Sequence, residues 1–372
     1  MLPTRFVFWQ PIPSMHQLPF IEAFTGRVGG EVSCVCGEAV TPDRIALGWT
    51  NPSASLVPLS TPPLGESLAA IAAAGPETLQ VFSGMHCHPY VNACFRKAVT
   101  ARAPIALISE SYDPRGVRGL IRRVRSRWDA IRVGAAIRAI FAMGAIGERW
   151  FRAAGFPGDR IYSFAYVTPV TPAMAPAATS HPEFRILYVG QLIPRKGVDV
   201  LLQALATCRK ADWTLTIVGN GPAESGLKQL AVHSGVLDRV TWVKSVPNTE
   251  IARMMAGHDL LVLPSRYDGW GAVVNEAITV GTPVICSDAC GAADLIRSSF
   301  MGEVVRAGSA GSLAEALQRC ISVGSTRPDV RRRLAAAAER FSPSSVADYF
   351  LAALEASFGG GVAPCPPWRA DP

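Results

Sequence analysis

Short runs of Val, Ile, Leu and Phe recur along this chain and alternate with longer amphipathic stretches. In the first half, strand-like runs begin near residues 5, 31, 79 and 104, and helix-like stretches lie between them. The second half repeats the pattern, with strand-like runs beginning near residues 184, 213, 240, 259, 282 and 302. Continuous apolar runs of this length are typical of parallel strands covered on both faces. We therefore predict an α/β protein built from doubly wound parallel sheets.

The chain has 372 residues, which is long for one hydrophobic core and favours two domains. The segment VTPVTPAMAPAATSHPE is rich in Pro, Ala and Thr and has the composition of an interdomain linker. We predict a first Rossmann-like domain over residues 1–166, the linker over 167–183 and a second Rossmann-like domain over 184–341. A last helix over 342–357 and a mobile tail over 358–372 complete the predicted organisation.

Composition narrows the class of protein. The chain is 49% hydrophobic, yet it has no run of about 18 apolar residues, and its N-terminus lacks the features of a signal peptide. Nine scattered cysteines without a CxxC pair predict free thiols and no metal site. We therefore expect a cytoplasmic protein. Its net charge of +7 is concentrated in one segment without a nucleic-acid motif, so we expect no nucleic-acid partner.

A cationic loop follows the first strand-like run of the second half, in the stretch GQLIPRKGVDVLLQAL. Gly190 ends the strand, and Arg195 and Lys196 precede a helix that is predicted to begin near Val198. Ligands of open α/β sheets bind at the carboxyl ends of strands, and a helix N-terminus favours anions there. The loop predicts a diphosphate site. A solvated basic loop explains these residues equally well.

Two further glycine-containing loops follow later strands. In IVGNGPAESGL, Gly219 and Gly221 allow the backbone to approach a flat ligand such as a nucleotide base, although a simple turn is the commoner explanation.

The second of these loops lies in RYDGWGAVVNEA, where Asp268 precedes Glu276 by eight positions, with Gly269, Trp270 and Gly271 between them. The two carboxylates suit hydroxyl groups of a sugar and of a ribose. Alternatively, Asp268 is an N-terminal cap and Glu276 a first-turn acid that complements the helix dipole.

Taken in order, these motifs closely resemble the nucleotide-sugar domain of family 4 retaining glycosyltransferases of GT-B fold. The resemblance covers residues 184 to about 320, where VPNTEI and GAADLI also match, and is weaker at PSMHQLPFIEAF in the first half. It implies two Rossmann-like domains that face a central cleft, with the acceptor bound by the first. In such an enzyme Glu276 would bind the ribose and Asp268 the donor sugar, near the amides of residues 269–271. Lys196, with Arg195, would bind the diphosphate.

The chain departs from that family pattern at two positions. Asp268 stands where many members have Glu, and its side chain is shorter by one methylene. Gln191 stands where many members have Arg, so one phosphate-binding cation is missing unless Arg195 replaces it.

The resemblance implies sugar transfer with retention, from a nucleotide-diphosphate donor to a saccharide or lipid-linked saccharide acceptor of surface polysaccharide biosynthesis. It implies no cofactor and no metal ion. Two alternatives remain open at this point: a GT-B nucleotide-sugar epimerase, and a non-catalytic subunit that binds nucleotide sugar.

Histidines follow two strand-like runs of the first half. His16 lies in SMHQ, and His86 and His88 lie in SGMHCHPY. Related enzymes place a histidine near the donor sugar, which makes His16 and His86 candidate catalytic residues, but a packing or surface role is commoner for any one histidine. The pattern does not choose between them.

Residues 114–138 hold eight arginines and one aspartate. The stretch GVRGLIRRVRSRWDAIRVGAAIRAIF has apolar residues at 117, 121, 124, 128 and 131, which fit one stripe of a predicted helix. Such a helix either lies on an anionic membrane surface, on the inner face of a membrane, or packs into the core with a solvated basic face. Both interpretations are open from the sequence.

Overall fold

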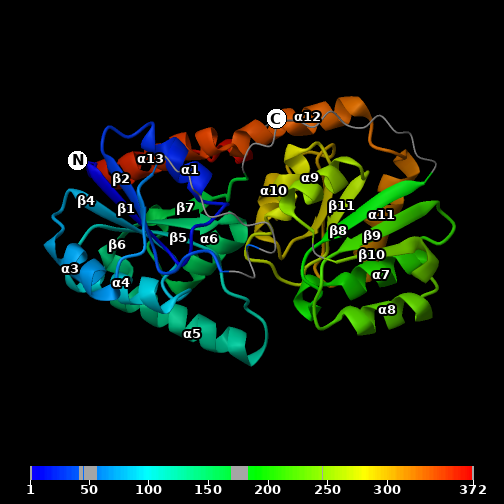
Figure 1. The fold of residues 1–372 in the computed structure, drawn as a ribbon, viewed down its shortest axis with the longest axis horizontal. Helices are drawn as coiled ribbons and strands as arrows, with labels where there is room; N and C mark the ends of the chain where they lie inside the picture. The colour runs from blue at the N-terminus through cyan, green and yellow to red at the C-terminus, as the bar shows by residue number, and fades with distance from the viewer. Residues whose placement is uncertain (1, 42–44, 46–56, 169–182, 245, 371–372) are drawn as a thin grey trace. The chain divides into compact units, whose positions relative to one another are not determined.

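A computed structural model describes residues 2–41, 45, 57–168, 183–244 and 246–370. The chain divides into two compact units, the first made of residues 1–45, 49–169 and 340–370 and the second chiefly of residues 170–339. Figure 1 traces both units along the chain. Most of the predicted linker, residues 169–182, lies outside the described residues.

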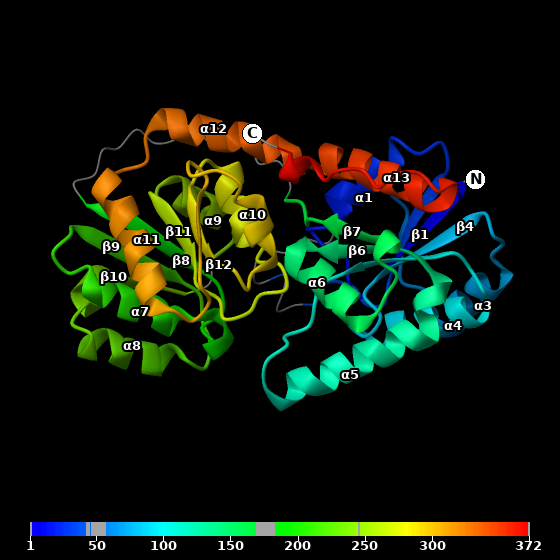
Figure 2. The ribbon, with the colours of Figure 1, turned by 180° about the vertical axis from the view of Figure 1, so that it is seen from behind.

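The first unit holds a seven-stranded sheet with the order β3-β2-β1-β4-β5-β6-β7, and every described pair is parallel. Its strands are β1 (Arg5–Gln10), β2 (Glu31–Cys36), β3 (Leu59–Ser60), β4 (Thr78–Ser83), β5 (Ile105–Ser109), β6 (Ile137–Met143) and β7 (Ile161–Phe164). Its helices include α1 (Leu18–Thr25), α3 (Leu64–Ala73), α4 (Pro89–Thr100), α5 (Gly116–Val133) and α6 (Gly144–Ala154). Figures 1 and 2 show α1 on one side of this sheet and α3, α4 and α5 on the other.

The end of the basic segment differs from the sequence prediction. The helix α5 stops at Val133, and the residues that follow Ala136 form β6 rather than a continuation of the helix. The run IRAIFAM is almost wholly buried between β5 and β7, and a strand covered on both faces has no alternating pattern. The apolar pattern therefore wrongly predicts a helix here, and β6, α6 and β7 are not predicted from the sequence.

The second unit holds a six-stranded parallel sheet with the order β10-β9-β8-β11-β12-β13. Its strands are β8 (Phe184–Val189), β9 (Trp213–Val218), β10 (Val240–Val243), β11 (Leu260–Leu263), β12 (Val284–Ser287) and β13 (Gly302–Val305). Its helices are α7 (Val198–Thr207), α8 (Glu224–His233), α9 (Asn248–Ala256), α10 (Val273–Thr279), α11 (Ala310–Val323) and α12 (Pro328–Ala338). The six strands predicted for this half are confirmed, as is the helix start at Val198.

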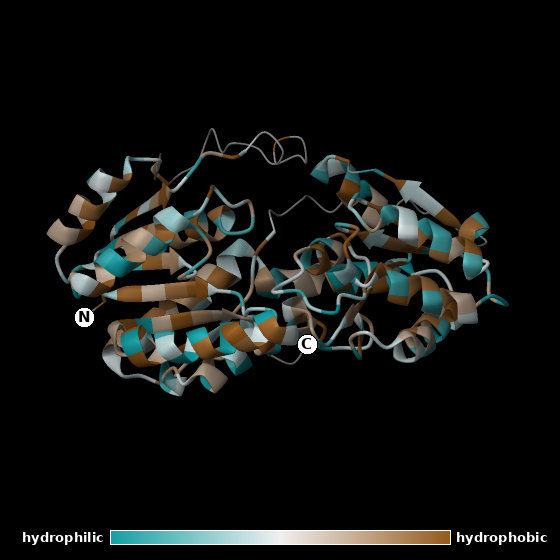
Figure 3. Cartoon of the chain, turned by 90° about the horizontal axis from the view of Figure 1, so that it is seen from below, coloured by the Kyte–Doolittle hydropathy of each residue, from teal (hydrophilic) through white to brown (hydrophobic). Residues whose placement is uncertain are grey.

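Hydropathy follows this architecture. Figure 3 shows hydrophobic residues along strands of the sheets and alternating hydrophilic and hydrophobic residues along the helices. The core of the second unit includes Trp213, Tyr188 and Leu201, each at most 1% exposed. Among the described residues, no helix combines the length and the apolar character needed to cross a membrane.

The last long helix, α13 (Pro343–Gly359), belongs to the first unit although it follows the second along the chain. It packs against α1, and Phe350 is fully buried there. The aromatic rings that surround Phe350, with centroids 4.2–6.2 Å away, are those of Phe8, Phe20, Phe24, Phe141 and Phe164. This helix thus completes the core on one side of the first sheet.

The segment after α13 was predicted to be a mobile tail. In the structure it contains the short 3-10 turn η7 (Pro367–Arg369), and the ring of Trp368 lies 5.3 Å from that of Tyr349. Trp368 is 2% exposed, and Arg369 Nη2 donates to Glu148 Oε1 on α6 at 2.5 Å. An aromatic anchor and an ion pair therefore hold residues 367–369 to the first unit.

We expect Phe350→Ala to destabilise the first unit by about 3–5 kcal/mol, because it removes a ring from a packed aromatic cluster and leaves a cavity. Urea unfolding followed by circular dichroism measures the loss. Phe358→Ala, on the same helix but only partly buried, is the matched control and should cost much less. Equal losses in the two variants would contradict the central place of Phe350.

Candidate functional site

The candidate site of the second unit begins where β8 and β11 lie side by side. These strands pair in parallel, with Leu260 opposite Ile186, so the loops at their carboxyl ends meet at one edge of the sheet. Gly197 has φ +71°, and a Cβ there would lie 2.2 Å from the carbonyl oxygen of Pro264. A glycine is therefore needed at 197 to bring the cationic loop against the loop that carries Asp268.

An ionic cluster joins these two loops. Lys196 Nζ lies 2.5 Å from Asp268 Oδ2, and Arg195 Nη1 lies 3.6 Å from Asp268 Oδ1. Arg195 also donates to the carbonyl of Tyr267 at 2.9 Å, and Ser265 Oγ lies 3.4 Å from Asp268 Oδ2. The Lys196 and Asp268 side chains are only 15% and 11% exposed. A largely desolvated carboxylate is thus held by two cations.

The backbone around Asp268 is fixed on both sides. Its N–H donates to the carbonyl of Ala289 at 2.9 Å, and its own carbonyl accepts from the N–H of Gly291 at 3.1 Å. Asp268 also forms an isolated parallel bridge with Cys290. The residues after β11 and those after β12 therefore hold each other, and the Asp268 carboxylate is positioned by a rigid backbone.

The glycine-flanked tryptophan lies between Asp268 and α10. Trp270 is 1% exposed, and its Nε1 donates to Asn275 Oδ1 at 2.8 Å. Gly271 has φ +92°, and a Cβ there would lie 2.7 Å from Cys290 Sγ. A Cβ added at Gly291 would lie 2.4 Å from the carbonyl oxygen of Gly269. Trp270 thus anchors the start of α10 from within the protein.

Glu276 lies on α10, in its first turn. It keeps part of its surface open to solvent, yet the packing around its carboxyl raises its pKa from 4.5 to about 7, with burial as the cause. Among the described residues, the Glu276 carboxylate has no hydrogen-bond or ion-pair partner. The two carboxylates of the motif are therefore unlike: Asp268 is neutralised by cations, and Glu276 is desolvated.

A third loop joins the same edge. The N–H of Gly190 donates to the carbonyl of Val218 at 3.0 Å, and the N–H of Leu192 donates to the carbonyl of Asn220 at 2.7 Å. The loops after β8 and β9 therefore stay paired beyond the strands. A Cβ at Gly219 would lie 2.0 Å from the Gly190 carbonyl, and one at Gly221 would lie 2.4 Å from the Leu192 carbonyl. The structure thus brings the three predicted loops of the second unit to one edge of its sheet.

Gln191, the position where a phosphate-binding arginine is missing, is exposed in this cluster of loops. Its carbonyl accepts from the hydroxyl of Tyr188 at 3.0 Å. Of the cations that reach the Asp268 carboxylate, Arg195 is the nearest to Gln191 along the chain. Among the described residues, no three His, Cys, Asp or Glu side chains form a group that could hold a metal ion.

The first unit has a pocket of about 440 Å³ at the carboxyl ends of β1, β4 and β5. Its polar lining residues include Gln10, His16, Gln17, Ser83, Glu110 and Tyr166. Gln17 Oε1 accepts from Gln10 Nε2 at 3.1 Å and from Ser83 Oγ at 3.0 Å, which ties β1 to β4. Burial raises the pKa of Tyr166, which also bonds to Gln17 and Glu110. Such a polar pocket suits a hydroxyl-rich guest.

The three candidate histidines occupy different places. His16 lines this pocket, with its ring 6.1 Å from that of Tyr166. His86 instead bonds to Asp129 of α5, with 2.8 Å between Nε2 and Oδ2, and its Nδ1 lies 3.4 Å from Asn92. His88 precedes α4 without a side-chain capping bond, and its Nε2 lies 2.6 Å from Glu38 Oε1. The structure therefore places His16 in the pocket and ties His86 and His88 to carboxylates.

Sequence reasoning did not single out Ser265, Gln17, Glu110 or Tyr166. Ser265 lies two residues after β11 and is fully buried, so its place at the end of a strand was a usable signal. Gln17, Glu110 and Tyr166 come together only through the order of the strands. No spacing in the chain connects them.

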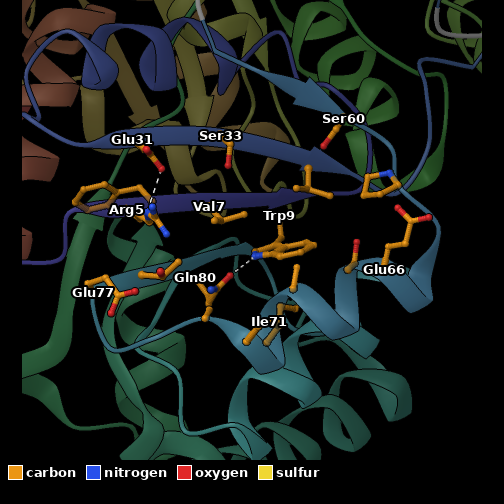
Figure 4. Close-up of a pocket in the computed structure, with 18 residues that line it drawn as sticks. Arg5, Val7, Trp9, Glu31, Ser33, Ser60, Glu66, Ile71, Glu77 and Gln80 are labelled. Atoms are coloured by element: carbon orange, nitrogen blue, oxygen red, sulfur yellow. Dashed lines mark hydrogen bonds and ion pairs between the residues drawn. The ribbon is translucent and has the colours of Figure 1, made fainter.

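A larger pocket, of about 540 Å³, lies elsewhere in the first unit, along the face of β1, β2 and β4 beside α3. Figure 4 shows Trp9 turned toward Gln80, where Nε1 donates to Oε1 at 2.7 Å, and Arg5 beside Glu31. Its lining includes Arg5, Glu31 and Thr78, the first residues of β1, β2 and β4, together with residues of α3. This pocket therefore does not coincide with the edge where the predicted site residues gather.

Comparison with known proteins shows which family and which folds this chain resembles. Residues 173–341 match the model of a family described as glycosyl transferases group 1. The chain is 30% identical over 243 residues to an alpha-D-kanosaminyltransferase of Streptomyces kanamyceticus, which covers 62% of this chain and 61% of the relative. It is 30% identical over 187 residues to a D-inositol 3-phosphate glycosyltransferase of Mycobacterium marinum, covering 48% of this chain and 40% of the relative.

Solved structures extend the likeness to both units. A lipopolysaccharide outer core galactosyltransferase, WaaB, matches with a TM-score of 0.69 and 16% identity over 96% of this chain and 99% of its own. Anabaena Alr3699/HepE, in complex with UDP, matches with a TM-score of 0.72 and 17% identity over 93% and 98%. The two α/β units therefore have the GT-B architecture, and residues 173–341 are similar to the glycosyl transferases group 1 family.

The raised pKa of Glu276 has a consequence for stability. As pH rises above 4.5 this carboxyl ionises in the unfolded chain, whereas the folded protein keeps its proton until about pH 7. Stability is therefore lost over that interval. We expect Glu276→Gln to be more stable than the parent at pH 8 by about 2 kcal/mol, because glutamine carries no charge and part of the side chain is solvated. The difference should vanish near pH 4.

Urea unfolding of both proteins at several pH values measures this difference. Glu315→Gln, at an exposed position of α11, is the matched control and should follow the parent at every pH. A stability difference for Glu276→Gln that does not vary with pH would show that the Glu276 carboxyl is not desolvated in the folded protein.

Proposed function

We propose that this protein is a glycosyltransferase that moves a sugar from a nucleotide-diphosphate donor, with retention and without a metal ion, to a saccharide or lipid-linked saccharide acceptor. We assign the reaction to surface polysaccharide biosynthesis at the cytoplasmic side of the membrane. The ionic cluster of Lys196, Arg195 and Asp268, in a motif that also carries the desolvated Glu276, is the observation that carries the proposal. The UDP bound to Anabaena Alr3699/HepE, a protein of the same fold, supports this class of donor.

The cluster suits a diphosphate because its two cations already pair with a carboxylate, that of Asp268. Lys196 and Arg195 converge on one carboxylate at the carboxyl edge of the sheet, close to the start of α7 at Val198. Buried ion pairs add little stability, because the desolvation of both charges offsets their attraction. A donor diphosphate would share the cations with Asp268 and release the carboxylate toward the sugar hydroxyls. Glu276, ionised, would accept from the ribose hydroxyls.

In the proposed reaction, the bond between the anomeric carbon and the diphosphate oxygen breaks, and a bond to the acceptor oxygen forms on the same face of the sugar. The acceptor hydroxyl gives its proton to the departing phosphate oxygen. Lys196, Arg195 and the helix N–H groups stabilise the negative charge that develops on the leaving diphosphate. This step uses groups at the edge of the second sheet and requires no cofactor.

The acceptor is assigned to the pocket of the first unit. Its lining offers donors and acceptors of hydrogen bonds from Gln10, Glu110, Ser111 and Tyr166, and an imidazole from His16. These groups match the hydroxyls of a saccharide better than an apolar or strongly anionic guest. We therefore propose His16 as the histidine that faces the substrate.

The test is a thermal-shift panel of UDP-, GDP-, ADP- and dTDP-sugars on the parent and on Glu276→Gln. We expect one donor class to raise the melting temperature of the parent and to bind Glu276→Gln about tenfold to a hundredfold more weakly, because a charge-assisted hydrogen bond is lost. A parent that responds to none of the donors would overturn the proposal, and parental affinity in the variant would overturn the role of Glu276.

With the donor identified, the products decide the type of activity. Release or transfer of the sugar supports the glycosyltransferase. Recovery of the donor with an inverted sugar carbon would identify an epimerase, and unchanged donor would identify a binding protein.

We expect Lys196→Ala and Arg195→Ala each to weaken donor binding and to slow transfer by about tenfold or more, because each removes a charge-assisted contact to the diphosphate. Isothermal titration and a transfer assay measure the two effects. Lys228→Ala is the matched control, since Lys228 also pairs with a carboxylate, Glu224 at 2.6 Å, but on the surface of α8. Normal transfer by Arg195→Ala would mean that Arg195 does not compensate for Gln191.

A further inference from the structure

The helix α5 faces solvent with its large apolar side chains. Its fully buried residues are Gly119 and Ser126, whereas its large apolar residues are mostly exposed: Val117 76%, Leu120 61%, Ile121 61%, Val124 52%, Trp128 57% and Ile131 72%. A helix on the surface of a soluble domain normally buries its apolar stripe. The interpretation in which this stripe packs into the core is therefore wrong.

These six residues, here called the α5 stripe, lie on one face of the helix. At about 100° per residue they fall within an arc of roughly 100° that points away from the line of Gly119 and Ser126. Small residues on the inner line let the helix approach the unit closely. The stripe is thus continuous and directed outward along the whole helix.

Arginines border the α5 stripe on both sides. By the same helical spacing, Arg118, Arg125 and Arg132 lie along one border, and Arg123 and Arg127 lie along the other. All five are exposed, and the guanidinium of Arg132 lies 5.9 Å from the ring centre of Trp128. The helix carries six arginines and one acidic residue, a net charge of +5 over residues 116–133.

That one acidic residue does not interrupt the positive border. Asp129 pairs with His86 at 2.8 Å and thereby ties α5 to the loop after β4. Trp150 of α6 donates to Ser126 Oγ at 3.2 Å, and Arg122 donates to the carbonyl of Asp113 at 3.2 Å. The helix is therefore fixed to the first unit in this orientation.

We propose that the α5 stripe and its arginines form a docking surface for an anionic lipid bilayer. Exposed apolar patches of this length mark interaction sites, and the arginines on both borders select a partner that is uniformly negative. In a bilayer the stripe enters the boundary between headgroups and acyl chains, and the arginines reach the lipid phosphates. A nucleic acid would leave the stripe without an apolar partner, and a protein surface with mixed charge would leave arginines unpaired.

This inference rests on the proposed function, because that function gives the bilayer contact a role. A bilayer bound by the first unit would present a lipid-linked acceptor near the pocket of that same unit. Binding to lipid, however, is measurable without any sugar transfer. The two proposals can therefore fail separately.

The experiment is co-sedimentation of the full chain with vesicles of phosphatidylcholine alone and of phosphatidylcholine with phosphatidylglycerol, at low and high salt. Two variants test the two parts of the surface. Arg118→Gln, Arg123→Gln and Arg127→Gln together remove charge at positions exposed to solvent, and Leu120→Gln, Val124→Gln and Ile131→Gln together remove apolar surface while keeping a good helix former. A matched control, Lys210→Gln with Arg253→Gln and Arg332→Gln, removes the same charge from exposed positions of the second unit.

We expect the parent to bind the anionic vesicles and to bind more weakly at high salt. The arginine variant should bind roughly a hundredfold more weakly, and the apolar variant at least tenfold more weakly. The control should bind like the parent, and all four proteins should show the same thermal shift with the donor. Failure of the parent to sediment, self-association of the parent in place of sedimentation, or unchanged binding by either α5 variant would overturn the proposal.

Discussion

Two parallel strands, β8 and β11, lie side by side, and the ionic cluster of the second unit depends on that pairing. Their loops meet so closely that a side chain at Gly197 would collide with the Pro264 carbonyl. Only with this contact do Lys196 and Arg195, 72 and 73 residues before Asp268, reach one carboxylate. The connection between the strands is long, so sheet order, rather than proximity in the chain, assembles the charges. The three glycine-containing loops and the start of α10 are arranged around this cluster.

The strands and loops of the second unit could be predicted because the signals were local. Each of its strands is a short apolar run, and each predicted loop follows a strand directly, so the parallel order placed the loops at one edge. The partners of the charged residues could not be predicted in the same way. The sequence indicated that Asp268 and Lys196 belong to one site, but not that they contact each other in the free protein, since that contact depends on the fold of two loops distant in the chain.

Prediction was weaker in the first unit, where the physical signals overlap. The apolar residues of IRAIFAM follow the amphipathic pattern of α5 without a clear break, so β6 was read as helix. The orientation of α5 was undecided because periodicity shows that apolar residues share one face but not which way that face points. Residues such as Gly119 and Ser126 carry that information, since they form the line that packs inward. The pocket around Gln17 was hidden for another reason: its residues come from three strands that only the sheet order makes neighbours.

The outward stripe of α5 and the buried pair of Lys196 and Asp268 have one property in common. Each contributes less to the stability of the isolated protein than apolar packing in the core would. Exposed Val, Leu and Ile side chains gain no burial energy, and a desolvated ion pair often stabilises a protein no more than packed apolar residues do. Features of this kind are expected where a surface or a charge is completed by a partner. We propose an anion at the edge of the second sheet as the partner of the ion pair, and an apolar phase with a negative surface as the partner of the stripe. An exposed apolar stripe alone would cause aggregation. Five exposed arginines along the stripe repel a second copy of the protein and attract an anionic bilayer, so the outward direction of α5 and the charge of its borders serve the same binding role.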